Sequence, residues 1–392
     1  MVNQTNRTRL GIFFTGSYNW IGGLYYVLNV VKTLNALPDR QKPELVILCS
    51  YNLPEEMIDK FEYPYIHKVL HYHSTKLEAG FIKGYKKLFK RDYRLEQLID
   101  TYRLDAIFPC IEILAEVKPK HPCKLIGWIP DFQHHFLPDF FDEKEIEKRN
   151  KRYTGLAKRA DYLVLSSHDA KGHYEQFYGK GAKAVPQVMN FISIVEVDNL
   201  PEEKVIREKY GLNGPYFMVA NQFWQHKNHR VVLEAIKLLR DQGQEVVVAM
   251  SGRKVDNRAP GFFNTLQAYI DDHSLTDSLN FLGFMPREDQ LAAMKYSVAV
   301  LQPSKFEGWS TVNEDAKVLN QFVICADLAV NREQMGDNSW YFDVNDAATL
   351  ASYLVKLLNG EAAPTLEYPS REKRIEDFAT DLMRMVAPVP VT

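Results

Sequence analysis

Cysteine is scarce in this sequence, with four residues scattered over 392 positions and no Cys-x-x-Cys pair among them. This scarcity argues against a disulfide framework or a zinc site and favours buried, reduced thiols in a cytoplasmic protein. Long apolar runs are lacking as well, since none approaches the roughly 20 residues that span a bilayer. The first residues, from Val2 to Arg9, are polar, so we expect no signal peptide.

An excess of charge of one sign is also missing. The 48 Lys and Arg residues nearly balance the 50 Asp and Glu residues, and a net charge of -2 predicts no nucleic-acid partner. No Asp-x-Asp pair occurs, which argues against a diphosphate held by a metal ion. What is present is a globular composition, 46% hydrophobic, over a length that predicts two domains.

Short apolar runs that predict buried strands alternate with helical patterns along the chain. In the first half these runs include Leu10 to Thr15 and Leu45 to Cys49. Proline and glycine interrupt the pattern from Val185 to Pro215, where we expect a linker, and Tyr216 to Ala220 begins a fresh series. The alternation predicts an α/β chain with two doubly wound parallel-sheet domains.

A strand, a loop, a helix and a second strand follow one another between Ser297 and Ala326, and the loop carries Glu307. The residues that open the helix are Gly308, Trp309, Ser310 and Thr311. A helix start binds anions through its free backbone N–H groups and its dipole. Because carboxylates accept hydrogen bonds from hydroxyls, a carboxylate beside such a helix start suits a nucleotide sugar.

A second helix start of this kind lies earlier in the same half. Lys227 and Asn228 stand just before a helix that the pattern predicts from Arg230 to Arg240. A lysine at this place can meet a diphosphate, whereas a lone lysine is otherwise a solvated surface residue. Both interpretations stay open from the residues alone.

In the first half, Gly22 and Gly23 precede a helix predicted from Leu24 to Leu37. A strand, a loop from Gly16 to Asn19 and a helix let a diphosphate approach the backbone closely. A Gly-Gly pair by itself is as often a tight turn.

A polar cluster, Asp131, Gln133, His134 and His135, follows a strand that ends at Ile129. Ligand sites in parallel sheets lie at the carboxyl ends of strands, so we favour a functional interpretation over structural histidines. Asp131 is the better candidate to orient an acceptor hydroxyl, because a carboxylate accepts its proton.

Lysines and arginines alternate with aromatic residues between Gly80 and Arg94. As a helix, this segment is basic on one side and aromatic on another, which is typical of helices that adsorb to anionic membranes. The alternative is an ordinary surface helix whose aromatic residues face the core.

These motifs resemble those of GT-B glycosyltransferases of family 4, the retaining group 1 type. Pro-Ser, two residues, Glu-Gly-aromatic-small and an acidic residue before Ala316 resemble the family's Glu-x7-Glu signature, and Lys227 and Asn228 match its Lys-Asn. The stretch from Gly127 to Pro138 resembles a bacterial subset that acts on surface polysaccharides. The likeness covers nearly the whole chain.

The resemblance implies two Rossmann-like domains that face a central cleft. Residues 1–195 would form the acceptor domain, with a C-terminal helix in residues 371–392 packing back on it. Residues 196–370 would form the donor domain. No metal and no cofactor are implied, because the nucleotide diphosphate sugar is a substrate.

For the site, the resemblance implies that Glu307 contacts the donor sugar and that a second acidic residue holds the ribose. Alignment through Ala316 favours Asp315, where the family has Glu, and Glu314 stays an alternative. Gln222 stands where the family has an Arg that neutralises the diphosphate. Lys227 alone, His226 or Arg253 would then compensate.

The resemblance adds further candidates on both sides of the reaction. Gly22 and Gly23 would lie near the donor phosphates. Phe284 and Met285 would lie against the nucleobase, or equally in the core. His134, favoured over His135, would lie near the reacting carbon of the sugar.

The implied reaction is transfer of a sugar, mannose or rhamnose, from a nucleotide diphosphate sugar to a hydroxyl of a glycan or lipid-linked glycan. Either the donor phosphate accepts the acceptor's proton or Glu307 is the nucleophile. We expect a cytoplasmic protein in peripheral contact with the inner face of the membrane through residues 80–94. A nucleotide-sugar epimerase and a non-catalytic glycan-assembly subunit stay open as alternative functions.

Overall fold

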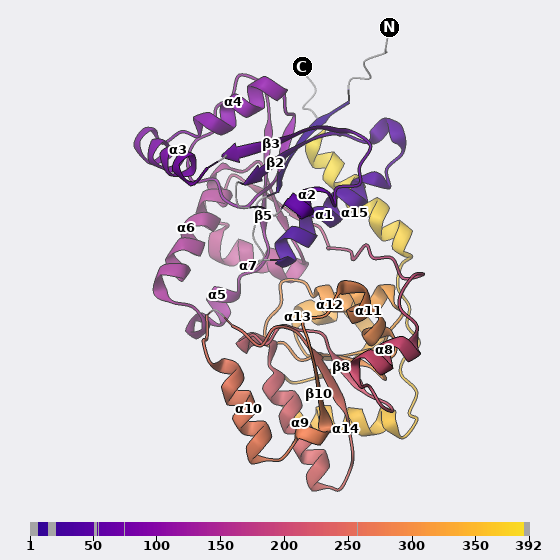
Figure 1. The fold of residues 1–392 in the computed structure, drawn as a ribbon. Coiled ribbons are helices and arrows are strands. Elements are labelled where there is room, and N and C mark those ends of the chain that lie inside the picture. Colours follow the sequence, from indigo (N-terminus) through magenta and orange to yellow (C-terminus); the bar gives the residue numbers. More distant parts are fainter. Residues whose placement is uncertain are drawn as a thin grey trace. The chain divides into compact units, whose positions relative to one another are not determined.

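The structure is a computed structural model that describes residues 7–14, 21–50, 53, 55–73, 75–256 and 258–387. The described residues group into two compact units, each built around a parallel sheet (Figure 1). The first unit comprises the described residues of Met1–Phe132, Glu143–Ile194 and Ser370–Thr392. The second comprises those of Gln133–Asp142 and Val195–Pro369.

The first unit is built on a seven-stranded sheet in the order β3-β2-β1-β4-β5-β6-β7, with every neighbouring pair parallel. Its strands are β1 (Arg9–Phe14), β2 (Glu44–Ser50), β3 (Ile66–His73), β4 (Ala106–Cys110), β5 (Lys124–Ile129), β6 (Tyr162–Leu165) and β7 (Val185–Val188). Strand order reverses between β1 and β4, and ligands of such sheets bind outside the strand ends at this point. The loop predicted from Gly16 to Asn19 lies outside the described residues.

Helices flank this sheet, and several of them begin at capping side chains. They are α1 (Ile21–Asn35), α2 (Glu55–Ile58), α3 (Lys76–Phe89), α4 (Tyr93–Tyr102), α6 (Glu143–Arg159), α7 (His168–Tyr178) and α15 (Arg371–Val386), with a 3-10 turn η2 (Asp39–Gln41). Thr75, Asp92 and Ser167 each accept a hydrogen bond from a backbone N–H of the first turn, which fixes where α3, α4 and α7 begin. The C-terminal helix α15 belongs to this unit and packs against α1.

The second unit is built on a six-stranded parallel sheet in the order β10-β9-β8-β11-β12-β13. Its strands are β8 (Phe217–Val219), β9 (Val248–Ser251), β10 (Leu279–Gly283), β11 (Val300–Gln302), β12 (Val323–Ala326) and β13 (Ser339–Phe342). Its α-helices are α5 (Gln133–Phe136), α8 (Glu203–Tyr210), α9 (His229–Asp241), α10 (Phe262–Asp272), α11 (Arg287–Lys295), α12 (Thr311–Val318), α13 (Ala329–Met335) and α14 (Ala347–Leu358). Short 3-10 turns are η3 (Pro138–Phe140), η4 (Gln225–Lys227), η5 (Thr276–Ser278) and η6 (Gly336–Asn338).

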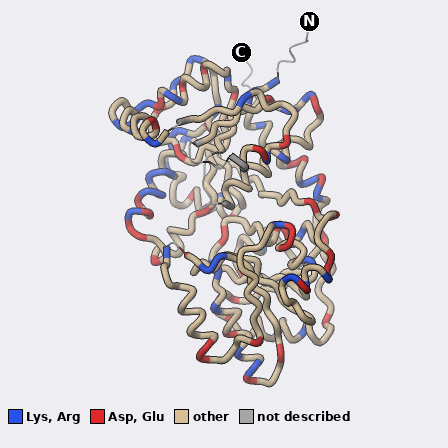
Figure 2. Tube along the Cα trace, in the orientation of Figure 1, with Lys and Arg blue, Asp and Glu red and all other residues tan. Residues whose placement is uncertain are grey.

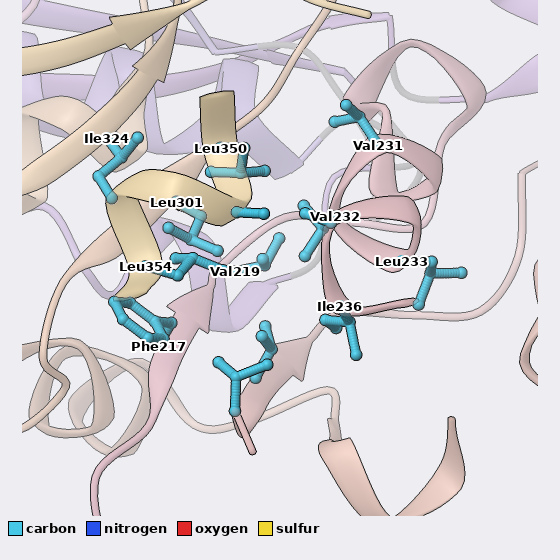
Figure 3. Packing of buried hydrophobic residues seen from close by; sticks show 14 of the residues in the cluster. Phe217, Val219, Val231, Val232, Leu233, Ile236, Leu301, Ile324, Leu350 and Leu354 are labelled. Atoms are coloured by element: carbon cyan, nitrogen blue, oxygen red, sulfur yellow. The ribbon is translucent and has the colours of Figure 1, made fainter. Parts of the chain in front are cut away.

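Both faces of the second sheet are buried by helices. Alternate residues of a strand point to opposite faces, so neighbouring residues pack in different clusters. Phe217 and Val219 of β8 pack with Ile236 of α9 and Leu354 of α14 (Figure 3). Met218, between them, packs in a second cluster with residues of α11 and α12. Helices α9 and α12 therefore lie on opposite faces of one sheet.

Two doubly wound parallel sheets are therefore present, as predicted. The prediction was wrong at two sheet edges, where β3 was missed and β7 lies inside the segment predicted as a linker. Edge strands lack the continuous apolar run of buried strands: Val69 of β3 is exposed, and β7 contains Pro186. Helix α1 also begins earlier than predicted and includes Gly22 and Gly23 in its first turn.

No helix among the described residues is long and apolar enough to cross a membrane.

Candidate functional site

In the second unit, strand order reverses between β8 and β11, so the loops that follow these two strands lie next to each other. The loop after β8 ends in η4 with Lys227, and the loop after β11 carries Glu307. Nζ of Lys227 lies 2.6 Å from Oε1 of Glu307, and the two side chains are 15% and 9% exposed. The topology of the sheet thus brings together two predicted site residues that are 80 positions apart.

Further hydrogen bonds join these two loops. The backbone N–H of Lys305 donates to the carbonyl of His226 at 2.8 Å. The side-chain amide of Asn228 donates to the carbonyls of Pro303 at 3.0 Å and Val344 at 2.7 Å. Asn228 was predicted to bind the donor, and in the structure its amide holds the loops at the start of α9.

Gln302, the last residue of β11, orients the carboxylate of Glu307. Its amide nitrogen donates to Oε1 of Glu307 at 2.9 Å and to Oγ of Ser310 at 2.8 Å, and its Oε1 accepts from Asn221 at 2.7 Å. No described residue donates a hydrogen bond to the other carboxylate oxygen, Oε2. Sequence reasoning missed Gln302, although a fully buried amide at the end of an apolar strand is a signal.

Some backbone N–H groups at the start of α12 already form hydrogen bonds within the protein. Oγ of Ser310 accepts from the N–H of Asn313 at 3.2 Å, and the N–H of Ser310 donates to Gln334 at 3.1 Å. The predicted anion-binding amide of Ser310 is therefore engaged within the fold. Gly308, Trp309 and Thr311 lie in the same loop and first turn.

The two candidates for the ribose occupy different environments. Glu314 is 1% exposed and accepts hydrogen bonds from Lys317 at 3.0 Å and from Gln334 at 3.0 Å, so it lies in the interior. Asp315 forms an ion pair with Arg287, whose side chain is 33% exposed at the start of α11. Asp315 is itself 2% exposed, so both carboxylates are buried and paired, and the choice between them for the ribose stays a prediction.

Gln222 and Arg253 meet beside a close backbone contact. The N–H of Arg253 donates to Oε1 of Gln222 at 2.8 Å. Gly252 precedes it with φ of 135°, and a Cβ there would lie 2.4 Å from the carbonyl oxygen of Asn221. The guanidinium of Arg253 lies 4.6 Å from the centre of the Phe284 ring, which is exposed.

Met285, in contrast, is buried in the cluster of α11 and α12. Of the two residues predicted to contact the nucleobase, Phe284 is the one whose ring is exposed to solvent.

The polar cluster after β5 joins the second unit through α5. Arg258 donates to Oε1 of Gln133 at 3.2 Å and lies 3.3 Å from Nδ1 of His226. The Phe136 ring stacks on Phe306, the residue before Glu307, at 5.4 Å. Gln133 and the buried His134 thus lie on a helix fixed to both site loops. Arg258 is a second residue that sequence reasoning missed.

Three predicted residues lie in the first unit. Asp131 forms an ion pair with Arg149 at 3.2 Å. Gly22 is exposed and Gly23 is buried, both in the first turn of α1. The roles of these residues stay predictions.

His229 begins α9 next to the Lys227 loop. Its ring is fully buried and stacks on Phe223 at 4.3 Å. Burial, assisted by the charge of Lys227, lowers the pKa of His229 to about 3. The imidazole is therefore neutral near pH 7 and adds no positive charge beside Lys227.

All four cysteines are free thiols, and three of them are buried. No group of three or more His, Cys, Asp or Glu residues in the described ranges is placed to hold a metal ion.

Residues 202–377 match the family model described as glycosyl transferases group 1. This match spans Lys227, Glu307 and Asp315, the residues whose geometry is given above. The second unit carries a group 1 glycosyltransferase domain. The O-antigen chain mannosyltransferase RfbU of Salmonella typhimurium is 21% identical over 215 residues, or 54% of this chain. The chain spans only 56% of that relative's length.

Solved structures resemble this chain over nearly its full length. A glycosyltransferase from Rickettsia africae has a TM-score of 0.64 at 15% identity, covering 97% of this chain and 93% of its own. Anabaena HepE in complex with UDP and glucose has a TM-score of 0.64 at 12% identity, covering 97% and 96%. The predicted GT-B fold class is confirmed, and so is the group 1 resemblance. Membership of family 4 and the retaining stereochemistry stay predictions.

Proposed function

We propose that this chain transfers a sugar from a nucleotide diphosphate sugar to the hydroxyl of an acceptor. The observation that carries the proposal is the contact of Lys227 with Glu307 at the point where the second sheet reverses its strand order. A cation is needed where the diphosphate leaves, and a carboxylate is needed where the sugar hydroxyls bind. The two groups stand together at the edge of the sheet where such ligands bind.

In this proposal, Lys227 exchanges Glu307 for the diphosphate oxygens when the donor binds. Glu307, still held by Gln302, then accepts hydrogen bonds from the sugar. The acceptor oxygen attacks the anomeric carbon as the bond to the diphosphate breaks, and the acceptor's proton passes to a phosphate oxygen. The anomeric configuration is retained, and a covalent intermediate on Glu307 is the rival mechanism.

Mannose is the sugar that we propose, since the relative in Salmonella is named as a mannosyltransferase of the O-antigen chain. A glycan or lipid-linked glycan is then the acceptor. We place the ribose at Asp315 and the base at Phe284, and we place His134 and Asp131 on the acceptor side. The protein would act in the cytoplasm, in peripheral contact with the inner face of the membrane through residues 80–94.

A donor panel tests this function. GDP-mannose, UDP-glucose and dTDP-rhamnose are each added, the melting temperature is measured, and release of the nucleoside diphosphate is followed with a glycan acceptor. The true donor raises the melting temperature, because it binds the folded state alone. Glu307→Ala and Lys227→Ala should each lower turnover about a hundredfold or more. Lys295→Ala, on an exposed lysine of the same unit, is the control.

Near-normal turnover in both site variants would contradict the assignment. An isomerised sugar nucleotide without acceptor would point to an epimerase, and absence of any donor binding would point to a non-catalytic subunit.

A further inference from the structure

Helix α3 contributes no buried side chain to the first unit, although all 14 of its residues are described. Leu77 is 87% exposed, and Phe81 and Leu88 are each 74% exposed. An ordinary surface helix turns its large apolar residues toward the core. The alternative that the aromatic residues face the core is therefore wrong for Phe81 and for Phe89, which is 55% exposed.

The exposed apolar residues form one stripe. At about 100° per residue, Leu77, Phe81 and Leu88 project within about 40° of one another around the helix axis. Ile82 and Tyr85 are half-buried, and Tyr85 projects about 40° from Phe81, so the stripe borders the part of the helix that faces the unit. A narrow row of large apolar side chains thus runs along the exposed side of α3.

A row of lysines accompanies this apolar stripe. Lys76, Lys83 and Lys87 also project within about 40° of one another, on the neighbouring part of the exposed side. They form no ion pair with any residue that the structure describes, and all three are exposed. Figure 2 colours lysine and arginine blue, in the orientation of Figure 1, where α3 is labelled.

The other cations of the predicted segment 80–94, except the exposed Lys90, serve the protein itself. Lys86 pairs with Asp92 at 2.5 Å, and Arg91 pairs with Glu96 at 2.6 Å. Arg94 donates to the backbone carbonyl of Tyr72. The charge that remains available for a partner is therefore concentrated on the lysine row of α3 and begins at Lys76, outside the predicted segment.

We propose that α3 docks this protein on an anionic lipid bilayer. Leu77, Phe81 and Leu88 enter the boundary between headgroups and acyl chains, and the lysine row contacts the anionic headgroups. Charge complementarity favours this partner. The lysine row matches the negative headgroups of the bilayer, and the apolar row matches the acyl chains beneath them. The purpose of docking, access to a lipid-linked acceptor, rests on the proposed function, whereas docking itself does not.

Co-sedimentation of the full chain with vesicles tests the proposal. Vesicles of phosphatidylcholine with about 30% phosphatidylglycerol should bind the protein, and pure phosphatidylcholine should bind it at least about tenfold more weakly. Replacing Leu77, Phe81 and Leu88 by Ser, or Lys76, Lys83 and Lys87 by Glu, should each lower partition about tenfold. The matched control replaces three exposed lysines of α6, Lys144, Lys151 and Lys158, by Glu, which changes net charge equally.

Equal partition of the α3 variants and the α6 control would overturn the proposal, as would background binding of the wild type to anionic vesicles. The latter result would be expected if α3 bound a protein instead. Turnover with a water-soluble acceptor separates this outcome from failure of the proposed function. The α3 variants should keep that turnover, and Lys227→Ala should lose it while still binding vesicles.

Discussion

Gln302 holds Glu307 by one carboxylate oxygen: its buried amide donates to Oε1 at 2.9 Å, and Lys227 contacts the same oxygen at 2.6 Å. Both contacts fix the direction of the carboxylate and leave Oε2 without a donor among the described residues. In the proposed function, the carboxylate that accepts hydrogen bonds from the sugar is thereby oriented before the sugar arrives.

Gln302→Leu keeps the approximate size of the side chain and removes the amide. Glu307 then loses its orientation, so we expect turnover to fall about tenfold to a hundredfold, with a smaller change in donor affinity. Steady-state kinetics and calorimetric titration with the nucleoside diphosphate measure the two effects. Gln321→Leu, another amide of the same unit that donates to Ser297, is the control. An unchanged kcat in Gln302→Leu would contradict the positioning role.

The ion pair of Lys227 and Glu307 also makes a prediction about stability. Its side chains are largely buried, so removal of one partner leaves the other charge without compensation. Lys227→Met should lower the apparent free energy of unfolding in urea by about 3 kcal/mol. The double variant with Glu307→Gln should recover part of this loss, because both charges are then gone. Additive losses in the double variant would mean that the pair contributes no coupling.

The sequence predicted where the loops of Lys227 and Glu307 lie, because each combines a strand end with an unusual residue at a helix start. Their role in binding a donor stays a prediction. The sequence could not predict their partners. Gln302 belongs to no spacing pattern, and Arg287 meets Asp315 only because α11 and α12 pack on the same face of the sheet. Edge strands β3 and β7 were missed because a strand with one open edge tolerates polar residues and proline.

Gly252 tests how closely the backbone must approach behind Gln222. A Cβ at this position would lie 2.4 Å from the carbonyl oxygen of Asn221, which neither backbone segment can accommodate without moving. Gly252→Ala should therefore lower the melting temperature and weaken nucleotide binding, with about 1–3 kcal/mol of stability lost. Gly243→Ala is a matched control, because its φ of 73° is also strained for alanine but nothing lies within 4 Å of the added Cβ. Equal losses in both variants would attribute the effect to φ rather than to the close approach.

His229 makes the stability of the second unit depend on pH. Its pKa is lowered by burial to about 3 in the folded protein, whereas an unfolded histidine titrates near 6.5. Between these values the unfolded chain binds a proton that the folded chain does not, so stability is lost as pH falls below about 6.5, by up to about 1.4 kcal/mol per pH unit. His229→Phe keeps a ring against Phe223 and removes the proton, so its loss between pH 7 and pH 5 should be smaller than that of the wild type by about 2 kcal/mol. His273→Phe, at a half-buried histidine, should keep the wild-type dependence, and identical pH profiles for all three proteins would rule out His229 as the source.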